Sequence, residues 1–366
     1  MEARQAGNRN YGVDLLRMVS MFLIAMLHTL AQGGAMVRLA GAEGTYYALW
    51  FLETCAYCSV DCYGLISGYV GVNNRFRPAR FLELWFLVFF YQVLITAGFT
   101  LLAPQLVTST NLWKTLFPVS WKTYWYFSAY AGLFMVTPFL NKMIHAMDDR
   151  ELKRMAAVLF LVFSAGTAIP KANGSDFLSL GGGYSFVWLV ILYLLGAVIR
   201  RCEFRRWRAW QYLLAYFGLA GFSWIFKILM ENYTREVYGE PRWGRIFTSF
   251  TAPTILLCAV CLFLIFESMK IRGRMLVRLI TAASPLAFSV YIIHVQPLIW
   301  DNVMKGAFSS YRYLSPPLAM LAVIGTALMI CLVCGLIDAV RQGLFRILRV
   351  REKAEKLASW CGKVIR

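Results

Sequence analysis

Residues 11–30 read YGVDLLRMVSMFLIAMLHTL, an apolar run long enough to cross a membrane that nevertheless carries ionisable side chains. At about 100° per residue, the positions from Arg17 to His28 make about three helical turns, so both side chains lie on one face, roughly 16 Å apart along the axis. Asp14 lies on nearly the same stripe, one turn before Arg17. Ionisable groups at membrane depth usually face a bundle interior or a water-filled cavity. The stripe therefore predicts a buried polar path that starts at one membrane surface and ends well inside the protein.

The composition is that of a polytopic membrane protein. Of the 366 residues, 59% are hydrophobic and 15% are charged, whereas about a quarter of the residues of a soluble domain are charged. Apolar runs recur along the whole chain, and no polar stretch is long enough to form a separate soluble domain. The sequence therefore predicts an all-α bundle of about ten transmembrane helices with no soluble domain.

The basic residues predict the orientation of these helices. Clusters of Lys and Arg lie before the first helix, in alternate connections and after the last helix, which is typical of cytoplasmic loops and puts both termini in the cytoplasm. The formal charge of +18 thus reflects membrane topology, and we expect no nucleic-acid partner. Residues 1–345 are predicted to form the transmembrane domain, and residues 346–366 a basic amphipathic tail on the cytoplasmic membrane surface. The predicted spans are about 11–31, 46–72, a third ending near 103, 124–147, 153–169, 185–200, 209–230, 248–269, 279–301 and 317–340.

Three C-x-x-C pairs could indicate a zinc or redox site. They lie inside apolar runs, lack turn residues and have no histidine nearby to complete a ligand set. We interpret them as small apolar residues on helix faces and predict no metal site. The pairs are Cys55 with Cys58, Cys258 with Cys261, and Cys331 with Cys334.

His28, Arg77 and Arg80 are the first candidates for chemistry. The ordinary pKa of histidine suits a general base near neutral pH, and a helix-packing hydrogen bond is the weaker alternative for His28. Arg77 and Arg80 form the sequence RPAR at the predicted cytoplasmic end of the third helix. Two arginines at this spacing could clamp a diphosphate, or they could serve membrane topology alone, and the spacing leaves both readings open.

Other polar and aromatic residues form a second set of candidates. Asp61 lies deep in the predicted span 46–72 and is expected to face the same polar path. Tyr124 and Trp125 fit either an interfacial aromatic belt or the floor of a sugar site. Tyr291 and His294, in SVYIIHVQPLIW, fit packing and chemistry equally well.

In combination these motifs resemble the acyltransferase-3 family of integral membrane acyltransferases, over the whole chain. Arg17 and His28 match the family's R-x10-H arrangement, following the D-x-x-R that begins at Asp14. Arg77 and Arg80 match its R-x-x-R at the start of the third helix. Three further segments resemble family segments in the same order: VDCYGLISGYV (60–70), YWYFSAYAGLFMVTPFLNKMI (124–144) and SPLAFSVYIIHVQPLI (284–299).

The resemblance implies a multi-pass enzyme of the cell inner membrane with no tightly bound cofactor. It would move an acyl group, most often acetyl from cytoplasmic acetyl-CoA, to a hydroxyl of an envelope polysaccharide or lipid-linked sugar. Arg77 and Arg80 would hold the CoA phosphates, and His28 would act as general base or take the acyl group itself. Arg17, fixed by Asp14, would hold a phosphate or the developing oxyanion.

Two further expectations accompany the resemblance. Some relatives carry an additional extracytoplasmic hydrolase-like domain, and its absence from this sequence leads us to expect that the membrane domain performs the whole transfer. The main alternative function is a transporter for a lipid-linked sugar or a small polar solute. It would explain the helices and the polar path but not the ordered set of motifs.

Overall fold

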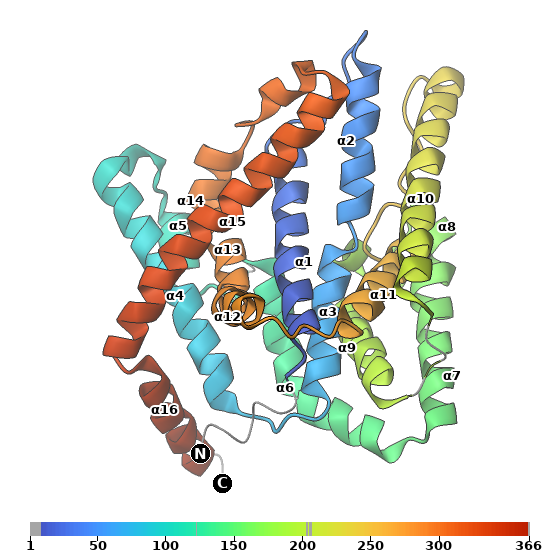
Figure 1. The fold of residues 1–366 in the computed structure, drawn as a ribbon. Helices are drawn as coiled ribbons and strands as arrows, with labels where there is room; N and C mark the ends of the chain where they lie inside the picture. Colours follow the sequence, from blue (N-terminus) through green and yellow to red (C-terminus); the bar gives the residue numbers. More distant parts are fainter. Residues whose placement is uncertain (1–8, 122, 203, 205–206, 365–366) are drawn as a thin grey trace.

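The computed structural model describes residues 9–121, 123–202, 204 and 207–364, and these residues form helices and loops without any strand (Figure 1). The predicted cytoplasmic ends, residues 1–8 and 365–366, and part of the basic connection 200–208 lie outside the described residues. The α-helices are α1 (Tyr11–Leu30), α2 (Glu43–Ala56), α3 (Ser59–Gly71), α4 (Pro78–Leu102), α5 (Ser109–Leu116), α6 (Trp125–Ala146), α7 (Asp149–Phe160), α8 (Gly166–Ala172), α9 (Phe186–Arg201), α10 (Ala209–Tyr238), α11 (Pro253–Glu267), α12 (Arg274–Ala283), α13 (Ala287–His294), α14 (Pro297–Ile299), α15 (Pro316–Ile347) and α16 (Val350–Val364).

Short 3₁₀ and π segments join several of these helices. They are the 3₁₀ helices Pro104–Leu106, Gly181–Gly183, Ser284–Leu286 and Ser309–Tyr313, and the π-helical turns Leu161–Ala165 and Trp300–Met304.

Six helical segments in the described part of the chain are long and apolar enough to cross a membrane. The predicted all-α membrane class is confirmed, but the predicted count of ten spans is not. One reason is that the predicted span 46–72 is two helices, α2 and α3, separated by Tyr57 and Cys58. The six segments are Tyr11–Leu30, Pro78–Leu102, Asp149–Pro170, Ala209–Tyr238, Arg274–His294 and Pro316–Ile347, and α11 is an apolar helix of shorter length.

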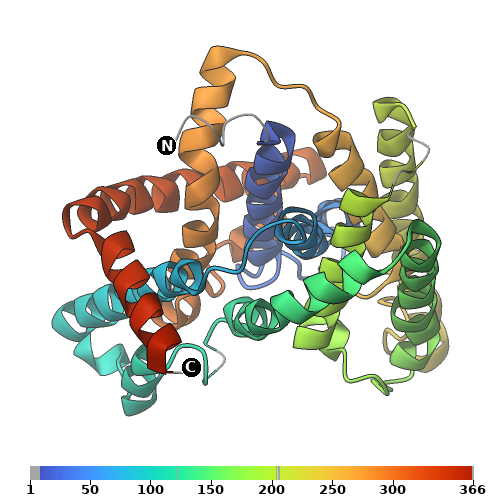
Figure 2. The same cartoon turned by 90° about the horizontal axis from the view of Figure 1, so that it is seen from below.

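Helix α1 lies at the centre of the bundle, where it contacts α2, α3, α11, α12, α13 and α15 (Figure 2). Asn10 caps its start, since the side-chain oxygen accepts hydrogen bonds from the backbone N–H groups of Gly12 and Val13. Leu16 and Ala25 are fully buried. The cap and the buried side chains fix the position of α1, and therefore the positions of its ionisable side chains, inside the protein.

The tightest helix pair in this core is α3 with α9. A Cβ atom on Gly68 would lie 1.8 Å from the backbone oxygen of Tyr193, and one on Gly196 would lie 2.1 Å from that of Leu65. Small residues allow helix backbones to approach this closely in membrane bundles. Gly68 and Gly196 therefore permit the close approach of α3 and α9.

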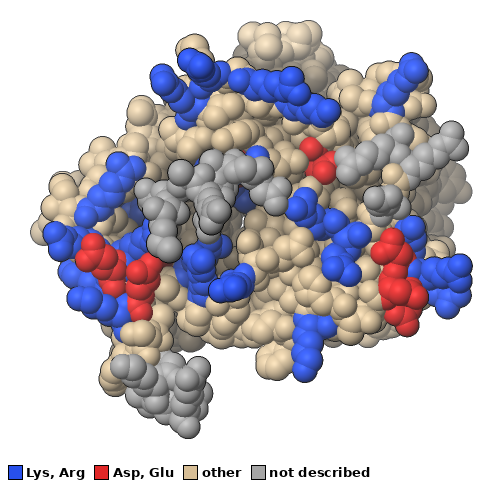
Figure 3. Space-filling view, turned by 60° about the horizontal axis from the view of Figure 1, so that its bottom comes forward, with Lys and Arg blue, Asp and Glu red and all other residues tan. Residues whose placement is uncertain are grey.

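The two ends of the bundle carry different helix termini. The lower end in Figure 1 carries the start of α4 and helix α16, which packs against α4 and α15. Figure 3 shows this end with many Lys and Arg side chains spread across it and few Asp and Glu. The upper end carries the start of α2 and the end of α10 (Figure 1). These two ends are called the lower and the upper end below.

Candidate active site

An ion-pair network at the start of α1 fixes the first of the predicted site residues. Asp14 accepts a hydrogen bond from Arg9 Nε at 2.6 Å and from Arg17 Nη1 at 2.9 Å. Arg17 Nη1 also lies 3.2 Å from Ser284 Oγ, which comes from the turn before α13. The expected pairing of Asp14 with Arg17 is therefore present, and it orients the guanidinium toward the lower end.

A cavity of about 480 Å³ opens beside the start of α4, and four arginines line it: Arg17, Arg75, Arg77 and Arg80. Arg77 is the N-cap residue of α4, and Arg80 lies in its first turn. Among the described residues, none forms an ion pair with Arg75, Arg77 or Arg80. Guanidinium groups and a helix N-terminus both favour phosphate, and the volume is typical of a ligand site. This lower cavity is therefore suited to a large phosphorylated ligand.

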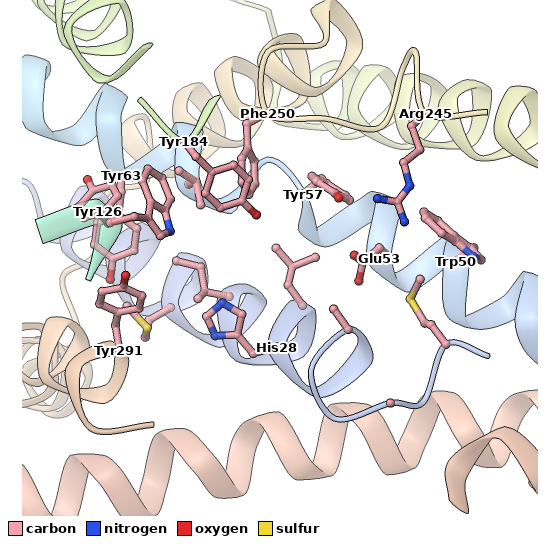
Figure 4. Close-up of a pocket in the computed structure, with 18 of the residues that line it drawn as sticks. His28, Trp50, Glu53, Tyr57, Tyr63, Tyr126, Tyr184, Arg245, Phe250 and Tyr291 are labelled. Atoms are coloured by element: carbon pink, nitrogen blue, oxygen red, sulfur yellow. The ribbon is translucent and has the colours of Figure 1, made fainter. Parts of the chain in front are cut away.

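A second cavity, of about 510 Å³, lies higher in the bundle and contains His28. Figure 4 shows the imidazole between two groups of side chains. Tyr63, Tyr126 and Tyr291 lie on one side of it, and Trp50, Glu53 and Arg245 lie on the other (Figure 4). The ring of Trp125 also lines this upper cavity. Such a chamber can hold a sugar on aromatic faces with a histidine in reach.

The two cavities meet at a thin aromatic boundary. Tyr63, Tyr126 and Phe288 line both of them, and the ring centroids of Tyr63 and Tyr126 are 6.1 Å apart. Tyr63 Oη donates a hydrogen bond to the carbonyl oxygen of Arg17 at 3.0 Å, which anchors the boundary to α1. Along the predicted polar path of α1, Arg17 therefore lines the lower cavity and His28 the upper one, and the three rings lie where the two cavities meet.

His28 forms a direct hydrogen bond with His294, with Nδ1 of His28 lying 2.7 Å from Nε2 of His294. On its other side, Nδ1 of His294 lies 2.5 Å from the carbonyl oxygen of Val290. A carbonyl oxygen only accepts, so Nδ1 of His294 carries a proton and its Nε2, in the neutral ring, is an acceptor. His28 must then donate through Nδ1, which leaves its Nε2 unprotonated. No described residue hydrogen-bonds to that Nε2, so it is free to accept a proton from a ligand.

His294 is the last residue of α13, and the following proline determines where this helix ends. Pro297 lacks a backbone N–H and its ring would clash with the carbonyl of the fourth residue before it, so the helix ends at His294. Gln296 then caps α14, since its Oε1 accepts from the backbone N–H of Leu298 at 2.7 Å. His294 is 2% exposed, so its ring orientation is set by packing as well as by its two hydrogen bonds.

The remaining predicted candidates divide into two groups. Trp125 and Tyr291 line the upper cavity, and the Tyr291 hydroxyl is buried with no hydrogen-bond partner among the described residues. Asp61 and Tyr124 line neither cavity. Asp61 accepts a hydrogen bond from Trp188 Nε1 at 3.0 Å, and the Tyr124 hydroxyl donates to a backbone carbonyl at 2.9 Å. These two residues therefore join helices behind the chamber, and the expectation that Asp61 faces the polar path is not met.

Glu53 and Arg245 also line the upper cavity. Glu53 is buried, and its Oε2 has no hydrogen-bond partner among the described residues. A carboxyl group inside an apolar run was a usable signal for Glu53. The sequence does not indicate Arg245 as a site residue, because it lies in a loop with other arginines and is far from His28 along the chain.

Comparison with known proteins identifies the family. A family model described as an acyltransferase domain matches residues 10–336, a range that includes both cavities and the paired histidines. No curated protein and no solved structure matches the chain. The matched range is most of the sequence, and it contains the R-x10-H, R-x-x-R and late histidine motifs quoted above. The chain therefore belongs to the acyltransferase-3 family of membrane acyltransferases.

Proposed function

We propose that this membrane acyltransferase is an O-acetyltransferase that takes acetyl from cytoplasmic acetyl-CoA. The acceptor is a hydroxyl of an envelope polysaccharide or lipid-linked sugar. The observation that carries the proposal is the pair of cavities that meet at Tyr63, Tyr126 and Phe288. One cavity carries Arg75, Arg77 and Arg80, which form no ion pair with any described residue, and the other carries a histidine with a free nitrogen. These are the two groups that a phosphorylated donor and a hydroxyl acceptor require.

Acetyl-CoA enters from the lower end in this proposal. Its phosphates bind Arg77 and Arg80, and Arg17 adds a third guanidinium to the same cavity. Arg17 serves the phosphates rather than the reacting carbonyl, because it is roughly 16 Å below His28 along the axis of α1. The flexible pantetheine arm then extends past Tyr63 and Tyr126 and brings the thioester beside His28.

The transfer step follows from the free nitrogen of His28. The acceptor hydroxyl attacks the thioester carbon while His28 Nε2 takes its proton, and a tetrahedral oxyanion forms. Collapse of this intermediate breaks the C–S bond, and the CoA sulfur leaves with the proton returned by His28. The products are an O-acetyl ester and free CoA. The buried hydroxyl of Tyr291, which has no hydrogen-bond partner within the described part of the chain, is a candidate donor to the oxyanion.

His294 positions this base. The Nε2 atom of His294 accepts a hydrogen bond from His28 Nδ1 at 2.7 Å, which selects the His28 tautomer whose own Nε2 is free. This hydrogen bond strengthens when His28 becomes an imidazolium. Direct acylation of His28 would use the same nitrogen. General-base catalysis is preferred because the cavity of His28 adjoins the donor cavity at Tyr63, Tyr126 and Phe288, so donor and acceptor can bind at the same time and need no separate half-reactions.

The proposed location is the cell inner membrane, with both termini in the cytoplasm. The lower end then faces the cytoplasm, consistent with the Lys and Arg side chains in Figure 3 and with the positive-inside rule. Acetyl-CoA is available on that side, while the upper cavity faces the envelope. A transporter for a lipid-linked sugar is the alternative; two cavities would serve it, but it needs neither unpaired arginines at the lower end nor a histidine pair.

The test uses purified protein in nanodiscs with radiolabelled acetyl-CoA. Wild type should bind acetyl-CoA and release or transfer the label, and Arg77→Gln with Arg80→Gln should weaken binding at least tenfold. Arg154→Gln, at an exposed arginine of α7 outside the cavity, is the matched control and should bind normally. Mass spectrometry of envelope glycans with and without the gene should show a lost acetyl group. A wild-type protein that neither binds nor cleaves acetyl-CoA would contradict the proposal and favour transport.

A further inference from the structure

A third cavity, of about 570 Å³, lies at the upper end between the end of α10, the loop 239–246 and the start of α2. It is continuous with the chamber of His28, because five residues line both. These shared residues are Met36, Val37, Tyr46, Trp50 and Arg245. A ligand that occupies this outer cavity can therefore extend inward to the catalytic histidine.

The outer cavity is strongly basic. Its lining includes five cationic side chains, from Arg38, Lys227, Arg235, Arg242 and Arg245, and a single carboxylate, Glu231. So many like charges beside one another are costly in a protein unless an anion is present to balance them.

Glu231 alone does not balance this charge. Arg235 Nη2 lies 3.1 Å and Arg38 Nη1 lies 3.7 Å from its Oε1, and Lys227 contacts its other oxygen. The Tyr46 hydroxyl adds a hydrogen bond at 2.9 Å. Three cations thus surround one carboxylate, which leaves two positive charges in excess. The Lys227 side chain is only 3% exposed, so water solvates this cation little, whereas the Arg38 and Arg235 side chains are 25% and 44% exposed and can reach a ligand.

The neighbouring charges do not remove the excess either. Arg242 is paired with Glu240 at 2.7 Å on the exposed rim. The Arg245 guanidinium lies 5.6 Å from the Trp50 ring centroid and forms no ion pair within the described part of the chain. The Glu53 carboxyl lies beside Arg245 in the adjoining chamber (Figure 4), but it is outside the lining of the outer cavity. The outer cavity therefore keeps a net positive charge.

We propose that this outer cavity binds an oxyanion carried by the acceptor, a phosphate or a carboxylate, while a hydroxyl of the same acceptor reaches His28. The proposal rests on the proposed function, since it names the class of acceptor that this acyltransferase modifies. Arg38 and Arg235 present guanidinium groups that match the oxygens of either anion. Trp50 and Tyr46 supply aromatic faces for the attached sugar, at the point where the two cavities join.

This arrangement makes the charge of the acceptor a condition for productive binding. A neutral sugar that enters the outer cavity leaves the excess cations without an anion, whereas an anionic sugar neutralises them. Glu231 keeps the cations in place when the cavity is empty, because it forms ion pairs with Arg38, Lys227 and Arg235 together. The anion would thus bind in a site that is already formed.

The first arm of the test measures binding by isothermal titration calorimetry, with purified protein in nanodiscs of phosphatidylcholine. The probes are glucose, glucose 1-phosphate and glucuronate, and acetyl-CoA is titrated separately. Both anionic sugars, or one of them, should bind at least tenfold more tightly than glucose. The tighter of the two identifies the anion as phosphate or carboxylate. Failure of both to exceed glucose, including no measurable binding, would overturn the proposal.

The second arm uses variants. Arg38→Gln with Arg235→Gln keeps hydrogen-bond donors near Glu231 but removes the excess charge, so it should abolish the preference and leave acetyl-CoA affinity unchanged. Arg312→Gln is the matched control: Arg312 lies in Ser309–Tyr313, which packs near the start of α2, and does not line the cavity. A preference that survives the double substitution would refute the site. If anionic sugars bind but acetyl-CoA does not, the proposed function fails and the anion site stands.

Discussion

Replacing His294 with leucine should slow acetyl transfer and leave acetyl-CoA affinity unchanged. Leucine removes the acceptor that lies 2.7 Å from His28 Nδ1, while the lower cavity, the proposed site of the CoA phosphates, contains neither histidine. Without this partner the imidazole of His28 loses both its fixed tautomer and its fixed ring orientation. The fraction of molecules with a free, correctly aimed Nε2 then falls.

The size of the effect follows from this one hydrogen bond. It is charge-assisted in the transition state, when His28 carries the proton, and such bonds contribute about 1.5–3 kcal/mol. Since about 1.4 kcal/mol corresponds to a factor of ten in rate, kcat should fall about 10- to 150-fold. His294→Gln restores an acceptor oxygen at nearly the same reach and loses the hydrogen bond to Val290. That bond is worth about 1 kcal/mol, so this variant should stay within about tenfold of wild type.

The assay is acetyl transfer from radiolabelled acetyl-CoA by protein in nanodiscs, with the affinity for acetyl-CoA measured on the same samples. Size-exclusion profiles confirm that each variant is folded. The expected order of kcat is wild type, then His294→Gln, then His294→Leu, at constant acetyl-CoA affinity. A leucine variant with normal kcat, or a glutamine variant as slow as leucine, would show that the histidine contact has no part in positioning the base.

Three further predictions concern the base, the topology and the core. His28→Gln keeps hydrogen-bonding capacity but cannot take a proton at neutral pH, so transfer should fall about 10²- to 10⁴-fold while acetyl-CoA still binds; near-normal transfer would remove His28 from the mechanism. A reporter fused after Arg366 should be active only in its cytoplasmic form, and activity of an extracytoplasmic reporter there would contradict the topology. Gly68→Ala should lower the free energy of unfolding by about 1–3 kcal/mol, because the added methyl group would clash with the backbone of Tyr193. Gly98→Ala should leave the free energy of unfolding unchanged, because no atom lies within 4 Å of the added methyl group.

The sequence predicts helices best where an apolar run has clear ends. The predicted range 11–31 matches α1, Tyr11–Leu30, because Asn10 caps its start and glycines follow its end. The predicted end of α10 near 230 was too early. The helix continues to Tyr238 through polar residues because ion pairs from Glu231 support it on both sides, and it ends at Gly239 with φ of 74°. The break between α2 and α3 had no signal, since neither proline nor glycine marks it.

Helical periodicity predicts contacts within one helix of the candidate site but not contacts between helices. The helical period correctly placed Asp14 beside Arg17, because that contact is local. The contact between His28 and His294 joins positions 266 residues apart, and only the packing of α13 against α1 creates it. The same holds for the boundary rings, since Tyr63 and Tyr126 come from different helices. Long-range packing, rather than any local pattern, decides which polar residues share a chamber.

The aromatic boundary between the cavities also bears on how the protein insulates the membrane. Water that enters both cavities would shorten the insulating layer from the roughly 30 Å of a bilayer core to the rings of Tyr63, Tyr126 and Phe288. The transmembrane voltage would then fall mainly across these rings, and moving one elementary charge through them would involve about 2.3 kcal/mol per 100 mV. An acetyl group carries no charge. In the proposed reaction its passage to the envelope side would therefore be electrically silent, and acetyl units would be exported without discharging the membrane.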